Sequence, residues 1–488
     1  MALDVATIPY SRLDPGNGLA RRYLTEPDRV LPLFAHDYRD PRALRAFADE
    51  CLSAKSRLAG ALEKYNADVG GDADAARRVE GGGLCVISGQ QAGLLYGPAY
   101  TTYKLLTVIN LARVLTAELR EPVTPVFWVE SEDHDWAEVN RFFLGERRFA
   151  LQADVPAGTP VSDIEADPAS LLAELREALG DGDAWSLVEP EANVARWHVR
   201  NLARLVAGRG VVFVEPRMLR EPMRDLAEDI AKKSEAIDEA LRRDTGFEPA
   251  LSAPGGAYLF SGEGGVRRRL ARGDSVPDAW STDVVSRVLV QNAAFRPLAA
   301  VCGPGEIRYW AQLKPVHELF GVPMPAVVPR DAATLIEPSA SRDAAKLGLA
   351  LDDVVSGETT RPESAAAADP LSERLRGLAD EAKKLFGAVD DGSLDLPGDA
   401  QKPFRRTVGR LEEDLAKLAG RIDAARAEQK GVGKKRYDKL LAALRPRGRL
   451  QERSQSIFPA LLRHGPGLVD ELLRSFDPYE FGHYLVML

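Results

Sequence analysis

Five short apolar runs recur between residues 84 and 330, and they predict the strands of a buried sheet. Each run is continuously apolar, which is typical of parallel strands covered on both faces. The runs are LCVIS (84–88), PVFWVE (125–130), VVFVEP (211–216), LAAVCG (298–303) and PAVVPR (325–330). Between the first two, an apolar stripe at helical spacing predicts a helix and hence a βαβ unit. The stripe consists of Leu105, Val108, Ala112, Leu115 and Leu119, with Pro98 in the first turn.

The spacing of these runs predicts how the first three quarters of the chain are organised. Residues 1–80 are expected to form a mostly helical segment that packs on a core domain, residues 81–360. Two long intervals, about 151–200 and 217–295, separate the predicted strands, and we interpret both as insertions. The fold class is therefore α/β, with a parallel sheet at its centre.

A different periodicity begins after about residue 360. Apolar residues then alternate steps of four and three, which is the heptad pattern of a coiled coil. They are Leu371, Leu375, Leu378, Ala382, Leu385 and Val389, and then Phe404, Val408, Leu411, Leu415, Leu418, Ile422 and Ala425. The stretch RPESAAAADP is typical of a linker, and KGVGKK predicts a break before a further helix. We expect an α-helical coiled-coil arm over 361–475 that forms a homodimer contact, and a tail over 476–488.

Composition and charge narrow the class of protein. The chain has 488 residues, of which 45% are hydrophobic and 28% are charged, as in ordinary soluble domains. The net charge of −9 gives no attraction to a nucleic-acid backbone. No apolar run is long enough to span a membrane and no signal-peptide pattern is evident, so we expect a cytoplasmic protein. The three cysteines form no CxxC pair and the histidines show no ligand spacing, so we expect no zinc.

Polar residues gather directly after the predicted strands, in SGQQ, ESEDHD, EPR, GPGE and PR. In an open parallel sheet, ligands bind in the crevice at the carboxyl ends of the strands. After the first strand, the candidate binding residues are Ser88, Gln90, Gln91, Gly93, Gly97, Tyr100 and Lys104. The helix that follows Gly97 is expected to direct its N-terminus at the crevice, which suits an anion. Lys104 either reaches a phosphate or carboxylate there or is a solvated helix lysine.

The loop after the second predicted strand holds the densest group of acids in the chain. Glu132, Asp133, His134 and Asp135 are the candidate catalytic residues. Carboxylates and an imidazole suit acid–base work, the binding of a substrate amine, or Mg²⁺. The alternative is a solvated loop in which Asp133 or Asp135 caps the next helix.

The stretch GPGEIRYWAQLKP and the end of the last run supply the remaining candidates. Gly303, Gly305, Glu306, Tyr309 and Lys314 are predicted to bind substrate or nucleotide. The alternative is a glycine turn followed by an amphipathic helix. Arg330 is either an anion clamp or a surface charge after the last strand.

Four segments together resemble one known family. They are SGQQAGLLYGPAYTTYKLLT, PVFWVESEDHDWAEVN, GPGEIRYWAQLKPVHELFGVPMPAVVPR and LQERSQSIFPALLRHGPGLVDELLRSFDP. They resemble the cysteine-adding enzymes of bacillithiol biosynthesis, the BshC family. The resemblance implies a Rossmann-like core with connecting-peptide insertions, related to class I aminoacyl-tRNA synthetases, and a dimerising coiled-coil arm. One departure is Thr282-Asp283, near which the resemblance leads us to expect an asparagine.

The resemblance also implies a reaction: the joining of cysteine to the amine of glucosaminyl malate. Amide formation from a carboxylate in water is uphill, so we expect ATP as a co-substrate, with Mg²⁺ on the nucleotide. Activation through an adenylate and through an acyl phosphate both remain open. The alternative from another class is a non-catalytic, ligand-binding scaffold whose arm recruits a partner. Consumption of cysteine that depends on ATP would distinguish the enzyme from the scaffold.

Overall fold

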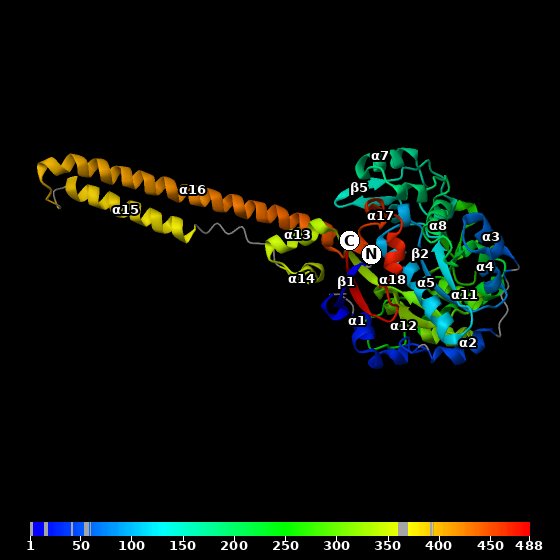
Figure 1. Ribbon diagram of the computed structural model, residues 1–488. Coiled ribbons are helices and arrows are strands. Elements are labelled where there is room, and N and C mark those ends of the chain that lie inside the picture. The colour runs from blue at the N-terminus through cyan, green and yellow to red at the C-terminus, as the bar shows by residue number, and fades with distance from the viewer. Residues whose placement is uncertain are drawn as a thin grey trace. The chain divides into compact units, whose positions relative to one another are not determined.

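A five-stranded parallel sheet forms the centre of the larger of two compact units (Figure 1). The computed structural model describes residues 3–13, 18–40, 42–52, 58, 60–359, 369–390, 393 and 395–488. The larger unit comprises residues 1–338, 355–357 and 444–488. In spatial order the strands are β11 (Ala326–Pro329), β10 (Ala299–Cys302), β2 (Cys85–Gln91), β3 (Thr124–Glu130) and β6 (Val212–Val214). All five strands predicted from the apolar runs are confirmed, and every neighbouring pair is parallel.

The order of the strands places a switch point in the middle of the sheet. The strand of this sheet that comes first in the chain, β2, is central, and β3 and β6 follow it towards one edge. The chain then returns, and β10 and β11 extend the sheet towards the other edge. The winding therefore reverses between β2 and β10, which is where ligands bind in doubly wound sheets. Ser88 joins these two strands, because its Oγ donates a hydrogen bond of 2.7 Å to the Val301 carbonyl.

The crossover between β2 and β3 is the predicted helix, α5 (Ala99–Leu119). Its apolar stripe is buried, from Leu105 to Leu119. The glycine at the end of β2 has a packing role. A Cβ on Gly89 would lie 2.8 Å from the Trp128 carbonyl oxygen, so only glycine allows β2 and β3 to approach this closely at their carboxyl ends.

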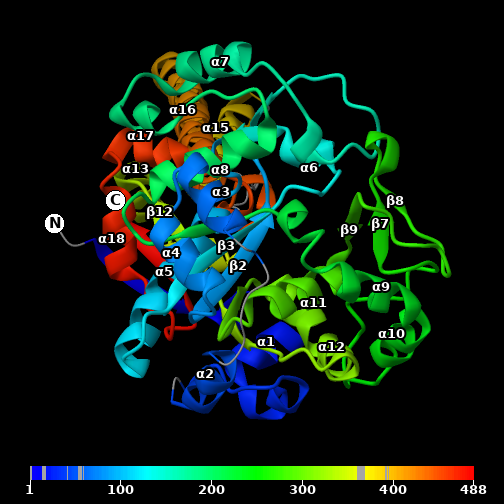
Figure 2. The same cartoon turned by 90° about the vertical axis from the view of Figure 1, so that its right-hand side faces the viewer.

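The two predicted insertions carry their own secondary structure. A hairpin that the sequence analysis did not anticipate, β4 (Arg141–Leu144) and β5 (Arg147–Ala150), precedes the first insertion, which contains α7 (Ala169–Leu179) and most of α8 (Val194–Leu205). The second contains α9 (Arg224–Lys232), α10 (Ser234–Leu241) and α11 (Val284–Phe295). Between α10 and α11 lies an antiparallel sheet of β7 (Leu259–Ser261), β8 (Arg268–Arg269) and β9 (Trp280–Thr282), which Figure 2 shows beside α9.

Both ends of the chain belong to a second sheet. Strand β13 (Gly482–Met487) pairs antiparallel with β1 (Asp4–Pro9) and parallel with β12 (Ala332–Ile336). The N-terminal segment, expected to be mostly helical, thus begins with a strand before α1 (Gly18–Thr25), α2 (Leu44–Leu52), α3 (Ala61–Val69) and α4 (Ala73–Glu80). Figure 1 also labels α12 (Pro304–Phe320), α13 (Pro338–Leu347) and α14 (Leu351–Ser356), and Figure 2 labels the short helix α6 (Trp136–Val139). No helix in these described ranges has the length and apolar character that crossing a membrane requires.

The smaller unit comprises residues 339–354 and 358–443. Within it, α15 (Pro370–Asp390) and most of α16 (Gly398–Leu444) lie side by side (Figure 1). The Ser372 Oγ donates a hydrogen bond of 2.5 Å to the Asp423 Oδ1, so the two helices run antiparallel. The predicted break at KGVGKK is wrong, because α16 continues through it. A glycine costs a helix only about 1 kcal/mol, which a long helix tolerates.

The residues after α16 return to the larger unit. Helices α17 (Phe458–His464) and α18 (Leu468–Ser475) bury Phe458, Leu461 and Leu472 in the same apolar core as β3 and β6. Residues 445–475 were expected in the arm, and the structure differs there because these side chains pack on the core instead. Most of the stretch expected to be a linker, RPESAAAADP, lies outside the described residues.

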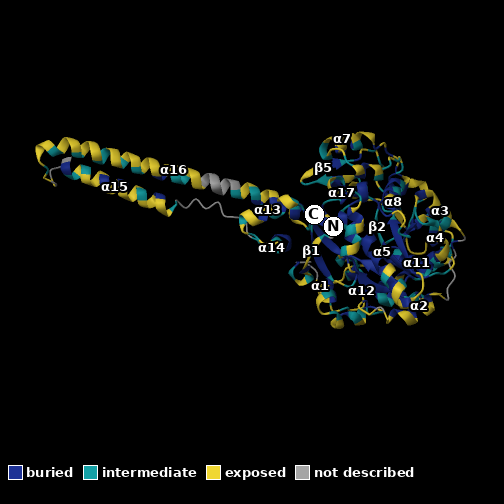
Figure 3. Ribbon diagram, in the orientation of Figure 1, coloured by how far each residue is buried: buried dark blue, intermediate teal, exposed yellow. Residues whose placement is uncertain are grey.

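Much of the surface of α15 and α16 is exposed (Figure 3), and the exposed residues include large apolar ones. Most of the buried positions of α15 and of the part of α16 beside it are small, namely Ser372, Ala379, Ala382 and Ala419, and Val389 is the larger buried residue there. The leucines one heptad apart are 46–55% exposed; they are Leu371, Leu378, Leu385, Leu411 and Leu418. The contact between α15 and α16 therefore buries only part of the apolar heptad positions.

Candidate active site

A cavity of about 570 Å³ lies at the carboxyl ends of β2, β3, β10 and β11, at the switch point of the sheet. It is large enough for small-molecule substrates. Ten of the residues singled out in the sequence line it: Gln90, Gln91, Tyr100, Lys104, Asp133, Gly303, Gly305, Glu306, Tyr309 and Arg330. The fold thus brings these residues together although they are far apart in the chain, as their positions at the strand ends predicted. We call this cavity the crevice.

A buried ion pair lies in the wall of the crevice. The Lys104 Nζ is 2.5 Å from the Glu306 Oε2, and it also donates to the Gly89 carbonyl at 2.8 Å and the Gln90 Oε1 at 3.0 Å. Burial opposes charge on both groups, but Lys104 nevertheless holds the pKa of Glu306 below its usual value. The same Glu306 oxygen accepts from the Gly303 amide at 2.8 Å, which fixes the first turn of α12. The charge of Lys104 is thus neutralised inside the protein.

Glu130, the last residue of β3, is the least satisfied carboxylate of the crevice. Its Oε2 accepts a hydrogen bond of 2.8 Å from the Trp128 indole and lies 3.9 Å from the Arg287 Nε. Its Oε1 is buried and has no hydrogen-bond partner among the described residues. Burial, only partly offset by Arg287, raises the pKa of Glu130. A carboxylate in this state suits the acceptance of a proton or the binding of an ammonium group.

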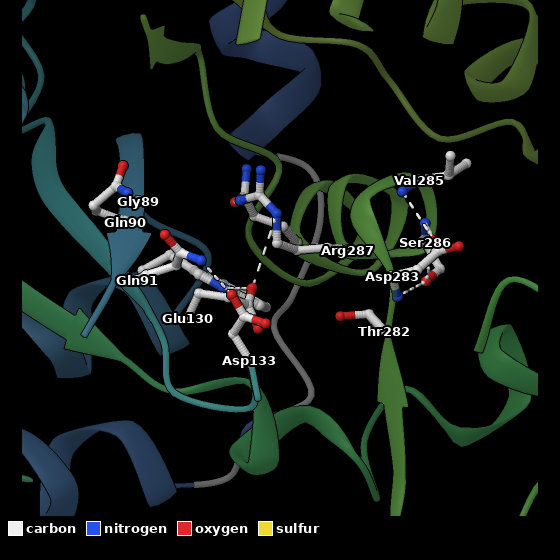
Figure 4. A network of polar contacts seen from close by, with 12 residues as sticks. Gly89, Gln90, Gln91, Glu130, Asp133, Thr282, Asp283, Val285, Ser286 and Arg287 are labelled. Carbon is white, nitrogen blue, oxygen red and sulfur yellow. Dashed lines mark hydrogen bonds and ion pairs between the residues drawn. The ribbon is translucent and has the colours of Figure 1, made fainter. Parts of the chain in front are cut away.

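Helix α11 supplies the cation that faces Glu130 (Figure 4). Arg287 lies in its second turn and also donates a hydrogen bond of 2.9 Å to the Tyr309 hydroxyl. Burial raises the pKa of Tyr309, so this phenol stays protonated. The helix begins at Asp283, whose Oδ1 accepts from the amides of Val285 and Ser286, both at 3.0 Å. An asparagine, which the family resemblance led us to expect near this point, would cap equally well.

The inserted antiparallel sheet supplies two further arginines to the crevice, Arg267 and Arg269. Both guanidinium groups lie over the ring of Phe260, at 4.0 and 4.4 Å from its centre. Arg269 pairs with the Asp283 Oδ2 at 2.9 Å, and Arg267 is 3.7 Å from the Asp133 Oδ1. The insertion is thus part of the site and is positioned by stacking and ion pairing.

The acidic loop after β3 contributes Asp133 to the crevice. The Gln91 amide donates a short hydrogen bond to the Asp133 Oδ2, as Figure 4 shows. His134 does not line the crevice; its Nδ1 lies 3.1 Å from the Arg267 Nη1. Asp135 caps α6, because its Oδ1 accepts from the Glu138 amide at 3.1 Å. For Asp135, therefore, the structure shows the capping role that was the alternative.

Glu132 points away from the crevice. It is 1% exposed and forms a short ion pair with Arg220, which precedes α9. Burial raises the pKa of Glu132 to about 7, although Arg220 opposes the shift. Its neighbour Ser131 donates a hydrogen bond of 2.6 Å to Glu215, the residue after β6. The end of β6 is thus occupied by internal contacts and does not line the crevice.

Arg330, after β11, is held in a buried ion pair. Its two terminal nitrogens bind the two oxygens of Glu452, at 2.9 and 2.5 Å. This bidentate pair joins the end of the sheet to the segment that leads into α17. Arg453 follows at once and lines the crevice with an exposed side chain.

Four other predicted site residues lie outside the crevice. Ser88 is buried between β2 and β10, and the Lys314 Nζ donates to the carbonyls of Pro32 and Phe34, at 2.9 and 3.1 Å. Gly93 and Gly97 border a smaller neighbouring cavity. The N-terminus of α5, expected to face an anion, is occupied, since the Ala99 amide donates to the Gln455 carbonyl at 2.7 Å.

Several residues of the crevice were not among the candidates from the sequence. The charged ones include Glu130, Arg267, Arg269, Arg287 and Arg453. Glu130 stood in the acidic stretch but was not chosen. Arg267 and Arg269 are two residues apart, a spacing that puts both on one face of a strand and could have identified them. Across the described ranges, no group of three or more His, Cys, Asp or Glu residues is arranged to hold a metal ion.

Comparison with known proteins identifies the relatives of this chain. Residues 3–275 and 267–331 match the family model "Bacillithiol biosynthesis BshC, N-terminal Rossmann-like domain". Residues 333–488 match "Bacillithiol biosynthesis BshC, C-terminal coiled-coil domain". A relative from Symbiobacterium thermophilum, named "Putative cysteine ligase BshC", is 31% identical over 96% of this chain and 97% of its own length. Relatives with the same name from Koribacter versatilis and Geobacillus thermodenitrificans are 30% and 28% identical, over 86% and 83% of this chain and 87% and 84% of their own lengths.

Proposed function

Because the chain belongs to the BshC family of bacillithiol biosynthesis and is a ligase, we propose that it joins cysteine to the amine of glucosaminyl malate, with ATP as co-substrate. The observation that carries this proposal is that one crevice contains both a proton-accepting carboxylate and anion-binding arginines. A buried carboxylate with an unpartnered oxygen, Glu130, lies in the same cavity as Arg267, Arg269 and Arg287. A ligase that joins an acid to an amine needs both environments within a few ångströms.

The carboxyl group of cysteine has to be activated before the amine attacks it. In the proposed reaction a carboxylate oxygen attacks a phosphorus atom of ATP, and a mixed anhydride forms as pyrophosphate or ADP leaves. The amine of the acceptor then attacks the carbonyl carbon, and AMP or phosphate departs with the bridging oxygen. Mg²⁺ would enter with the nucleotide, and the reaction would take place in the cytoplasm, where ATP is available.

Glu130 is the proposed proton acceptor for the amine. An amine attacks only after it has lost the proton of its ammonium form, and a carboxylate with a raised pKa accepts that proton readily. Asp133 lines the crevice beside it and would help to hold the ammonium form. Arg287 keeps Glu130 oriented through its contact with Oε2, while Oε1 has no hydrogen-bond partner among the described residues.

The arginines and the start of α12 are the proposed binding site for the anionic groups. Gly305 lies in the first turn of α12 and has open space around its Cα, so a phosphate or carboxylate can approach the helix N-terminus there. Arg267 and Arg269 are aligned by Phe260 of the same inserted sheet. Positive groups that are fixed before the reaction stabilise the charge that develops on the anhydride oxygens.

We further propose that the chain forms a homodimer through α15 and α16. The leucines at heptad spacing on these helices are about half exposed, from Leu371 to Leu418. Leucine seams of this kind are normally buried against another helix. A second copy of the same arm offers a matching seam.

The proposed function is tested by reconstitution. Purified protein is incubated with cysteine, glucosaminyl malate, ATP and Mg²⁺, and the thiols are identified by mass spectrometry. We expect bacillithiol to form only when all three substrates are present, with one nucleotide consumed per product. Binding of the substrates without any product would favour a ligand-binding scaffold instead.

A further inference from the structure

A second, smaller cavity of about 170 Å³ borders the crevice. The two cavities share Gln90, Gln91, Tyr100 and Arg453 in their linings, so they are neighbours along one surface. The second cavity lies between the β4–β5 hairpin, the loop after β2 and the segment that follows α16. We call it the side cavity.

The lining of the side cavity is strongly positive. It contains four arginines, Arg141, Arg447, Arg449 and Arg453, and a single carboxylate, Glu138. None of the four guanidinium groups forms an ion pair within the part of the chain that the structure describes. This distinguishes them from Arg267, Arg269 and Arg287 of the crevice, each of which lies near a carboxylate. Four cations that no carboxylate of the described ranges neutralises are therefore available to an anionic ligand.

The arginines of the side cavity are held in place. The Arg447 guanidinium lies 3.6 Å from the centre of the Phe143 ring, and that of Arg141 lies 5.8 Å from the same ring. Arg447 also has a left-handed backbone conformation, with a φ of 55°. Burial lowers the pKa of Arg447, and so does the charge of Arg449 and of Arg141. The protein thus keeps like charges close together, which is unfavourable until an anion binds between them.

The loop after β2, which lines the side cavity with Gly93, Leu94 and Gly97, also contains strained residues. Leu95 and Tyr96 have positive φ angles of 42° and 72°, a conformation that costs side chains of this size free energy. Gly97 follows with a φ of 66°, which glycine adopts readily. The Ser456 Oγ fixes this loop by donating a hydrogen bond of 2.6 Å to the Leu95 carbonyl. Such strain persists where the surroundings hold a functional geometry.

We propose that the side cavity binds the carboxylate groups of the amine substrate and so selects an acceptor that carries a dicarboxylate. This inference rests on the proposed function, because it takes glucosaminyl malate as the acceptor. The amine of that molecule would lie at Glu130 and Asp133 in the crevice. Gln91 binds Asp133 and also lines the side cavity, so the malyl group of the same molecule would extend past Gln91 towards the arginines.

Carboxylates fit the side cavity better than the triphosphate of ATP. The cavity volume of about 170 Å³ suits a four-carbon diacid, whereas the crevice of about 570 Å³ has room for a nucleotide. Planar guanidinium groups bind carboxylates through two parallel hydrogen bonds, which gives specificity as well as affinity. The rim of glutamine side chains, Gln90 and Gln91, suits the hydroxyl groups of a sugar between the two ends.

The test compares a double variant, Arg141→Gln with Arg449→Gln, with a control, Arg148→Gln. Arg148 is an exposed arginine in the same hairpin that lines neither cavity. In the double variant we expect the KM for glucosaminyl malate to rise about tenfold or more, with kcat and the KM for ATP changed by less than about twofold. The kcat/KM for free glucosamine, which lacks the carboxylates, should not change, so the discrimination between the two acceptors falls.

An unchanged KM for glucosaminyl malate would overturn the proposal. A rise in the KM for ATP alone would also overturn it, and would assign the side cavity to the triphosphate. Calorimetric titration with glucosaminyl malate, and with malate alone, separates this inference from the proposed function. If the wild-type protein shows no turnover, the proposed function fails. Weaker binding of both compounds to the double variant than to Arg148→Gln would still support the site, and equal binding would contradict it.

Discussion

The Nζ of Lys104 lies 2.5 Å from the Oε2 of Glu306, and this buried pair joins the helix after β2 to the helix after β10. It therefore spans the switch point of the sheet, where the crevice opens. Lys104 also holds the end of β2 through the Gly89 carbonyl. Its position in the sequence suggested contact with a phosphate, but its bonds indicate that it fixes the shape of the crevice.

This relationship predicts a strong coupling between the two residues. Lys104→Met leaves the partly buried Glu306 carboxylate without its partner and should destabilise the protein by about 1–3 kcal/mol. Combined with Glu306→Gln, the same change should cost much less than the sum of the two single variants, because no charge remains unpaired. Urea unfolding of the four proteins measures the coupling. Additive free energies of unfolding would show that the pair contributes no specific interaction.

Glu132 predicts a pH dependence of stability. Its pKa is raised by burial from 4.5 to about 7, so between these values the folded protein binds more protons at this residue than the unfolded chain does. Its contribution to stability therefore falls as the pH rises through this window. Glu132→Gln should remove that fall, so the variant should gain stability relative to wild type between pH 5 and pH 8. An equal difference in the free energy of unfolding at both pH values would contradict the assigned shift.

Asp133 and His134 are expected to differ in their effect on turnover. Asp133 lines the crevice and accepts a hydrogen bond from Gln91, so Asp133→Asn should lower kcat on the order of 10²-fold. His134 lies outside the crevice lining and contacts Arg267, so His134→Ala should have a smaller effect. Steady-state kinetics on the two folded variants makes the comparison. A larger loss from His134→Ala would assign the proton transfer to the imidazole.

The exposed leucines predict the oligomeric state. Replacement of Leu411 and Leu418 by glutamate places charges in the proposed seam and should convert a dimer to monomers in sedimentation experiments. Lys402→Glu, at an exposed polar position of the same helix, is the control and should leave the dimer intact. A dimer that persists in the leucine variant would place the interface elsewhere.

The sheet could be predicted from the sequence because each strand is a continuous apolar run. The carboxyl ends of parallel strands meet at one edge, so Gln91, Asp133 and Glu306 could be grouped without knowledge of the strand order. Strands β1 and β13 were not predicted. Each pairs with a strand at the other end of the chain, and the local sequence gives no sign of that pairing.

The roles of the charged residues could not be predicted, because each depends on a distant partner. Lys104 is neutralised by Glu306 and Arg330 by Glu452, and these pairs are brought together only by the fold. The arginines of the inserted sheet were missed for the same reason. Asp135 shows the opposite case, since its capping role is local and was already among the alternatives.

The central claim is that Glu130, at the end of β3, accepts the proton of the attacking amine. The most direct measurement compares kcat for Glu130→Gln and Glu132→Gln, two isosteric changes at residues two positions apart, of which only the first lines the crevice. We expect Glu130→Gln to lower kcat on the order of 10²-fold or more and to abolish the loss of activity at acidic pH, whereas Glu132→Gln should retain kcat within about threefold. Near-normal turnover by Glu130→Gln in a folded protein, or an equal loss in both variants, would contradict the account.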